Sequence, residues 1–133
     1  MDEVNETLRQ ALAVAAANPN EALHLLGTGL EKARKSGDCR GVSIFARHAG
    51  IISSQSGNLP AALKHYAEAL SASPGDAYLH FAKGDVHREL GQSREARSAF
   101  TRSLELATEQ GDTDVVKMAS EARARLGGEA DSN

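Results

Sequence analysis

The residues with the clearest capacity for chemistry are two histidines in the second half of the chain. His80 lies four residues before Gly84 and His87 lies three residues after it, with Asp85 next to that glycine. Residues at spacings of three and four share one side of a helix, so both imidazoles are expected on the same face. A zinc site would need a further ligand and a dry pocket. A metal-dependent enzyme is therefore a distant alternative, and we expect half-buried packing histidines instead.

The rest of the sequence carries no recognisable catalytic motif. It has no serine in a glycine elbow, no glycine-rich phosphate loop and no paired carboxylates of the kind used in acid–base catalysis. Each of these motifs places a nucleophile, a proton donor or a phosphate next to its partner group. We therefore predict that the protein is not an enzyme, with no catalytic residue, no bound metal and no cofactor.

The composition of the chain indicates which kinds of molecule the protein is not expected to bind. The chain of 133 residues has a net charge of -3, with 41% apolar and 25% charged residues, as in an ordinary soluble domain. Lysine and arginine are spread along it and form no basic stripe, so nucleic acid is not expected as a partner. No apolar run approaches the length of a membrane span, and one cysteine, Cys39, agrees with a reducing compartment. We expect a cytoplasmic protein that binds neither nucleic acid nor membrane.

The histidine pair belongs to a segment that repeats at a fixed spacing of 34 residues. Matching pairs at this spacing are Gly50 and Gly84, Gly57 and Gly91, Ala62 and Ala96, Tyr66 and Phe100, Ala69 and Ser103, and Leu70 and Leu104. Each unit has the pattern of two amphipathic helices joined at its second glycine. Units of this length bury an apolar face only against their neighbours, which is typical of an α-solenoid. The sequence therefore predicts an all-α fold.

Capping signals divide the chain into about seven helices. Asn18, Pro19 and Glu21 predict a helix start with a capping box, and Asp38 and Asp112 are expected as N-caps. The predicted helices span residues 3–17, 20–36, 39–56, 60–73, 77–90, 93–110 and 113–127. We expect one domain over residues 1–127, with repeats at about 3–36, 43–76 and 77–110, a terminal helix at 113–127 and a flexible tail at 128–133.

The register of the two outer helices is less firmly set than that of the repeats. In the first helix Gln10 falls where a small residue belongs, and a shift of one residue places Ala11 there instead. In the last helix an offset of 36 residues matches Gly84 with Ser120 and Leu90 with Leu126. That offset predicts the first helix of a further repeat.

The repeats resemble the tetratricopeptide repeat (TPR), and the resemblance covers nearly the whole chain. Gly50 and Gly84 match the small position in its first helix, Ala62 and Ala96 the tight position opening its second helix, and Pro74 the closing proline. The chain departs from the pattern at its tryptophan positions (Ala46, His80), at its tyrosine positions (Ser53, His87) and at Thr108, where the closing proline would stand. The resemblance implies a right-handed α-solenoid of antiparallel helix pairs.

The same resemblance implies a protein–protein interaction scaffold whose first helices line a concave groove for a partner's peptide or helix. The matching positions are Ile44, Arg47, Ile51, Ser54 and Gln55, then Tyr78, Phe81, Asp85, Arg88 and Glu89, and on the last helix Asp114, Lys117, Glu121 and Arg125. Each set follows spacings of three, four and seven, so each falls along one side of its helix. A self-associating module, with a homo-oligomer as its product, and a small chaperone are the alternatives within this class.

Two groups of side chains in this region have competing interpretations. Tyr78 and Phe81 are either groove anchors or residues partly buried under a neighbouring helix or the chain's own tail. Arg123 and Arg125 form either a clamp for an acidic peptide or a solvated end cap, which a terminal repeat needs. The family's carboxylate clamp uses basic and amide residues at positions that hold Ile51, Ala82 and Asp114 here. We therefore expect no clamp of that kind.

Overall fold

The computed structural model describes residues 2–126, and within them every regular element is an α-helix. The helices are α1 (Glu3–Ala15), α2 (Pro19–Ser36), α3 (Cys39–Gln55), α4 (Leu59–Ala72), α5 (Ala77–Glu89), α6 (Ser93–Gln110) and α7 (Thr113–Arg125). The predictions of an all-α fold and of seven helices are confirmed over this range, and each helix end lies within two residues of its expected position. The tail predicted at 128–133 lies outside the described residues.

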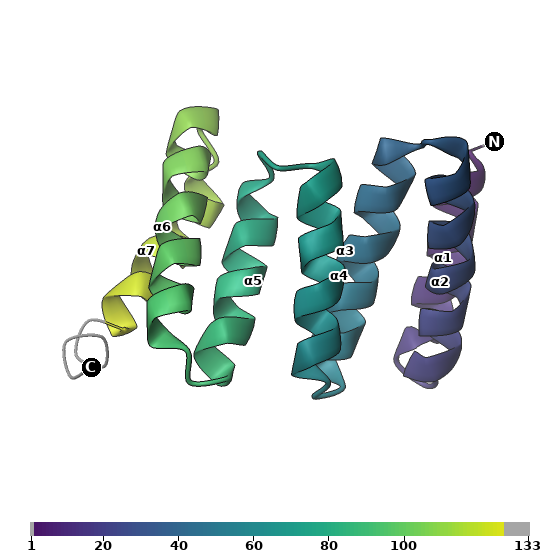
Figure 1. Cartoon of the computed structure of the whole chain (residues 1–133), viewed down its shortest axis with the longest axis horizontal. Helices are drawn as coiled ribbons and strands as arrows, with labels where there is room; N and C mark the ends of the chain where they lie inside the picture. The colour runs from purple at the N-terminus through teal and green to yellow at the C-terminus, as the bar shows by residue number, and fades with distance from the viewer. Residues whose placement is uncertain (1, 127–133) are drawn as a thin grey trace. The chain divides into compact units, whose positions relative to one another are not determined.

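The helices group into two compact units, Met1–Pro74 and Gly75–Asn133. In the first unit α2 packs against α1 and α3, and α3 packs against α4. In the second unit α5 packs against α6 and α7, which also pack against each other (Figure 1). None of the helices in residues 2–126 has the length and apolar character needed to cross a bilayer.

Short polar side chains start most of the helices, as their positions in the sequence predict. Asp38 accepts a hydrogen bond from the backbone N–H of Gly41 at 2.9 Å, and Asp112 accepts one from Val115 at 3.1 Å. Each bond satisfies a backbone donor that has no partner within the helix. The N-cap predictions for these two residues are confirmed.

The capping box predicted at the start of α2 forms only in part. Asn18 accepts a hydrogen bond from the backbone N–H of Glu21 at 3.1 Å, as expected for an N-cap. The Glu21 carboxylate accepts from the side-chain amide of Asn18 at 3.5 Å, whereas the backbone N–H of Asn18 donates to the carbonyl of Val14 at 2.8 Å. The last turn of α1 has therefore already used the donor that a capping box requires.

A close contact between a glycine and an aromatic ring occurs in both units at the same place in the 34-residue repeat. A Cβ atom on Gly50 would lie 2.6 Å from the ring of Tyr66, and one on Gly84 would lie 2.7 Å from the ring of Phe100. Both rings are buried, Phe100 completely. Only glycine allows the helix backbone to approach the ring this closely. The expectation that Gly84 sits where two helices touch is confirmed.

The structure also sets the register of the outer helices. In α1 Ala11 is fully buried and Gln10 is exposed, so the register shifted by one residue applies. In α7 the fully buried small residue is Ala119, and Ser120 beside it is half-buried. The offset of 36 residues nevertheless holds for the helix bounds: α5 and α7 are both 13 residues long, begin 36 residues apart and end before Leu90 and Leu126. Ser120 differs from Gly84 only in being half-buried where the glycine is buried.

Candidate functional site

A cleft lies between α5 and α7 of the second unit, with a volume of about 470 Å³. It is lined by Phe81, Asp85 and Arg88 from α5 and by Met118, Glu121, Ala122, Arg125 and Leu126 from α7 and its C-terminal end. Five of these residues are among those expected on the groove face, and they come from two helices. The structure therefore brings one part of the predicted groove together, and we name it the α5–α7 cleft.

The two walls of the cleft are placed by the spacing of residues on α5 and by the packing of α7. On α5 the residues Phe81, Asp85 and Arg88 follow spacings of four and three, so they project from one side of the helix. Along α7 the buried Val115 packs with Leu106 and Ala107 of α6, which fixes that helix against its neighbour. With α6 packed against both helices, α5 and α7 are held beside each other.

The floor of the cleft is apolar. Phe81 packs against a cluster formed by Ala96, Phe100, Ala122 and Leu126, and its ring centroid lies 5.7 Å from that of Phe100. Phe81 remains half-buried, so part of its ring faces the open cleft. The interpretation of this aromatic as partly buried under a neighbouring helix is thus correct, and the same contact leaves it available as a lining residue.

Charges of both signs surround that floor. The guanidinium of Arg88 donates to the Asp85 carboxylate at 2.7 Å through Nη2 and at 3.2 Å through Nε. Glu121 and Arg125 are exposed on the opposite wall. Exposed ion pairs contribute little to stability, but charges at a rim guide and orient a partner. The cleft therefore offers an apolar anchor position with a mixed-charge border.

Several predicted groove residues lie outside this cleft. On α5, Tyr78 packs against the cluster that includes Val115 and makes a ring contact with Phe81 at 6.2 Å, and Glu89 is exposed. On α7, Asp114 and Lys117 are exposed and do not line it.

The predicted residues on α3 belong to the first unit. Ile44, Arg47, Ile51 and Ser54 are half-buried there and Gln55 is exposed. None of them lines the α5–α7 cleft, the cavity among α1, α2 and α3, or the cavity between α5 and α6. Their assignment to a groove stays a prediction from the sequence.

Three lining residues were not predicted: Met118, Ala122 and Leu126. Met118 is 36% exposed. It lies three residues before Glu121 and seven before Arg125, so the spacing that identified those two residues includes Met118 as well. That spacing was the signal available in the sequence.

The two arginines at the end of α7 have different roles. Arg123 is half-buried, and its guanidinium donates to the hydroxyl of Thr101 on α6 at 3.3 Å. Arg125 is exposed on the wall of the cleft. Of the pair, Arg125 lines the cleft and Arg123 does not, and the clamp for an acidic peptide stays a prediction.

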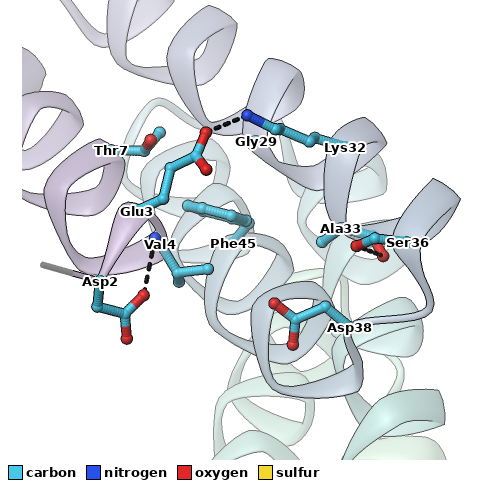
Figure 2. Close-up of a pocket in the computed structure, with 10 residues that line it drawn as sticks. All are labelled: Asp2, Glu3, Val4, Thr7, Gly29, Lys32, Ala33, Ser36, Asp38 and Phe45. Carbon is cyan, nitrogen blue, oxygen red and sulfur yellow. Dashed lines mark hydrogen bonds and ion pairs between the residues drawn. The ribbon is translucent and has the colours of Figure 1, made fainter.

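A smaller cavity of about 220 Å³ lies among α1, α2 and α3 of the first unit. Figure 2 shows the ring of Phe45 amid its lining side chains, with Glu3 extended toward Lys32. The carboxylate of Asp2 accepts from the backbone N–H of Val4 at 2.9 Å and also pairs with Arg40. Its acidic groups thus serve as caps and ion pairs, and the cavity is a weaker candidate than the cleft.

His80 and His87 are both half-buried and face α6, as expected for packing residues. Nδ1 of His87 lies 2.7 Å from Oε1 of Gln92. Within residues 2–126 no group of three or more histidine, cysteine, aspartate or glutamate side chains is arranged to hold a metal ion.

No protein-family model matches the chain, and no curated protein matches it.

Proposed function

We propose that this protein is a TPR-like solenoid of antiparallel helix pairs and that it serves as a protein–protein interaction scaffold. The recurrence of the glycine–aromatic contact at Gly50 and Gly84 supports the repeat, because both contacts occur at the same repeat position. Consecutive helices that pack on one another within each unit are consistent with it. The ligand is a peptide or helix of another protein.

The observation that carries the proposal is the α5–α7 cleft, where a half-buried aromatic and an exposed methionine border one apolar floor. Phe81 and Met118 supply the adaptable apolar surface on which partner side chains anchor. Asp85, Glu121 and Arg125 form a rim that selects the orientation of the bound segment. An amphipathic helix or extended peptide with one or two large apolar side chains fits this arrangement.

Selection of peptides from a displayed random library, with the whole protein immobilised, tests this proposal. Phe81→Ala should weaken the selected peptides by roughly 1–2 kcal/mol or more, as interface anchors do. Met118→Ala should also weaken the binding of the selected peptides. Its side chain is exposed, so this substitution should leave the fold intact. The matched control is Leu12→Ala, because Leu12 of α1 is also an exposed large apolar residue, at 45%.

Stability measurements on the same variants separate binding from folding. Phe100→Ala removes a fully buried ring and should lower the free energy of unfolding by about 3–5 kcal/mol. Phe81→Ala removes a half-buried ring and should lower it much less. If Phe81→Ala destabilises the protein as strongly as Phe100→Ala and both cleft variants keep full peptide affinity, the proposal fails. If the molecular mass in solution rises with protein concentration, the self-associating module is favoured. If the protein keeps aggregation-prone helices of many sequences in solution, the chaperone is favoured.

A further inference from the structure

A third cavity, of about 390 Å³, opens between α5 and α6 of the second unit. It is lined by His80, Lys83 and His87 of α5 and by Arg94, Glu95, Ser98, Ala99 and Arg102 of α6. His80, Lys83 and His87 follow spacings of three and four, and they occupy a different side of α5 from Phe81, Asp85 and Arg88. This α5–α6 cavity is therefore separate from the α5–α7 cleft.

The cavity has the opposite charge to the chain as a whole. Lys83, Arg94 and Arg102 carry positive charge around it, and Glu95 is the one acidic side chain in its lining. The complete sequence has a net charge of -3. A local excess of positive charge in an acidic protein attracts anions to this one place.

The cations of this cavity are poorly neutralised. Within residues 2–126 no ion pair joins Lys83 or Arg94 to a carboxylate, and Arg102 is paired only with the exposed Glu105 at 3.4 Å. Arg34, by contrast, is bound to Glu68 through two hydrogen bonds of 2.5 Å. The charges in the α5–α6 cavity are thus available for an external ligand.

The other lining groups suit an anion as well. Ser98 adds a hydroxyl donor, and the buried Ala99 also lines the cavity. Nδ1 of His87 already contacts Oε1 of Gln92 at 2.7 Å, so the donors for an anion are the arginine, lysine and serine side chains of the cavity. Arginine and lysine donors together with a hydroxyl are the groups that bind phosphoryl oxygens.

We propose that the α5–α6 cavity binds the phosphoryl group of a phosphate monoester, held by Lys83, Arg94 and Arg102. The phosphoryl group belongs either to a phosphorylated side chain of a partner protein or to a small phosphorylated molecule. The site does not depend on the α5–α7 cleft, because the two cavities share no residue.

The first probe is O-phosphoserine, titrated into the ¹⁵N-labelled whole protein at constant ionic strength. Saturable shifts of α5 and α6 amides are expected. Lys83→Glu/Arg94→Glu should weaken the affinity by roughly tenfold or more, since charge-assisted hydrogen bonds are lost. Lys35→Glu/Lys64→Glu changes the net charge equally but lies outside the cavity, so it should keep the affinity within about twofold.

Exposed Arg94 provides a test that does not disturb packing. Arg94→Glu alone should reduce the affinity and Arg94→Lys should restore most of it. Phe81→Ala in the α5–α7 cleft should leave the affinity for O-phosphoserine unchanged, which separates this site from the proposed partner cleft. Absence of saturable shifts, or equal weakening by the two double variants, would overturn the proposal.

A second arm identifies the source of the phosphoryl group. Peptides with one phosphoserine between randomised flanks should bind more tightly than O-phosphoserine if the ligand is a protein segment. Equal affinity of both probes would assign the site to a small phosphorylated molecule. In either case the unphosphorylated peptides should not bind, and binding of those peptides at the same site would contradict the proposal.

Discussion

Two glycines illustrate how a single missing methyl group has opposite consequences in different surroundings. Gly27 lies within α2, and a Cβ atom placed on it would meet nothing within 4 Å apart from its chain neighbours and the backbone of its own helix. A Cβ atom on Gly84 of α5 would lie 2.7 Å and 2.8 Å from ring atoms of Phe100 and 3.1 Å from Cβ of Ala99. Phe100 is fully buried, so its ring can yield to an added methyl group only by displacing its packed neighbours.

We therefore expect Gly27→Ala to stabilise the protein by about 0.5–1 kcal/mol, because alanine lowers the entropy cost of helix formation. Gly84→Ala should instead destabilise it by about 1–3 kcal/mol, because the clash exceeds this gain. Urea denaturation of both variants measures the two changes. A neutral or stabilising Gly84→Ala would show that the helices can separate at that contact.

Two histidines and one glutamate of the first unit predict how stability depends on pH. Burial lowers the pKa of His48, with a further contribution from the charge of Arg47, and burial also lowers the pKa of His65. The hydrogen bond from Arg34 holds the pKa of Glu68 below its ordinary value. For all three groups the unfolded chain binds a proton more readily than the folded chain. Stability must therefore fall as the pH falls.

The histidine contribution is complete above the ordinary histidine pKa of 6.5 and is lost below it, whereas the Glu68 contribution is lost only below 4.5. Denaturation at a series of pH values should show the free energy of unfolding decreasing from about pH 7 to about pH 5. His48→Gln/His65→Gln should flatten this part of the curve. The exposed His24→Gln is the control, and an unchanged slope in the double variant would refute the assignment.

At the scale of the helices, α6 is distinguished by its N-cap residue. Its N-cap, Gln92, makes no side-chain hydrogen bond to the backbone, whereas Asp112 caps α7 at 3.1 Å. Glutamine is too long for the N-cap bond that aspartate makes, and Gln92 contacts His87 instead.

Gln92→Asp should therefore stabilise the protein by about 0.5–1 kcal/mol, because a carboxylate would satisfy a free backbone donor and complement the helix dipole. Asp112→Ala should cost about 1 kcal/mol in the same thermal or urea denaturation experiment. A loss of stability in Gln92→Asp would mean that the contact with His87 contributes more than a cap does.

Helix ends were predictable because their signals are local. Asp38 and Asp112 bond to backbone groups three residues away, and Gly37 and Gly111 adopt the left-handed conformation that ends a helix. The partial capping box at Asn18 was not predictable, since it depends on how α1 ends. Met118 shares the helix-face spacing of Glu121 and Arg125, but that spacing does not specify which residues of the face line a cleft, because this depends on the distance between α5 and α7.

At the scale of the whole molecule, stability is unevenly distributed along the first unit. Ala11 is the one buried residue of α1, whereas α3 has eight buried residues, so far less apolar surface holds α1 in place. Two exposed ion pairs also join the start of α1 to its neighbours: Asp2 pairs with Arg40 of α3, and Glu3 pairs with Lys32 of α2. Such pairs contribute about 0–1 kcal/mol each.

Hydrogen exchange under native conditions should therefore show α1 opening before α3. Repeat proteins open in steps, because each helix is stabilised by its immediate neighbours, and the helix with the least buried surface opens at the lowest free energy. We expect amides of Glu3–Ala15 to exchange at least about tenfold faster than those of Cys39–Gln55, a difference of about 1.4 kcal/mol in opening free energy.

Arg40→Ala should change the α1 rates little, whereas Ala11→Asp, which introduces an unpaired charge at the buried position, should abolish α1 protection and leave α3 protected. Equal protection of the two helices in the unmodified protein would show that the first unit opens as a single cooperative block.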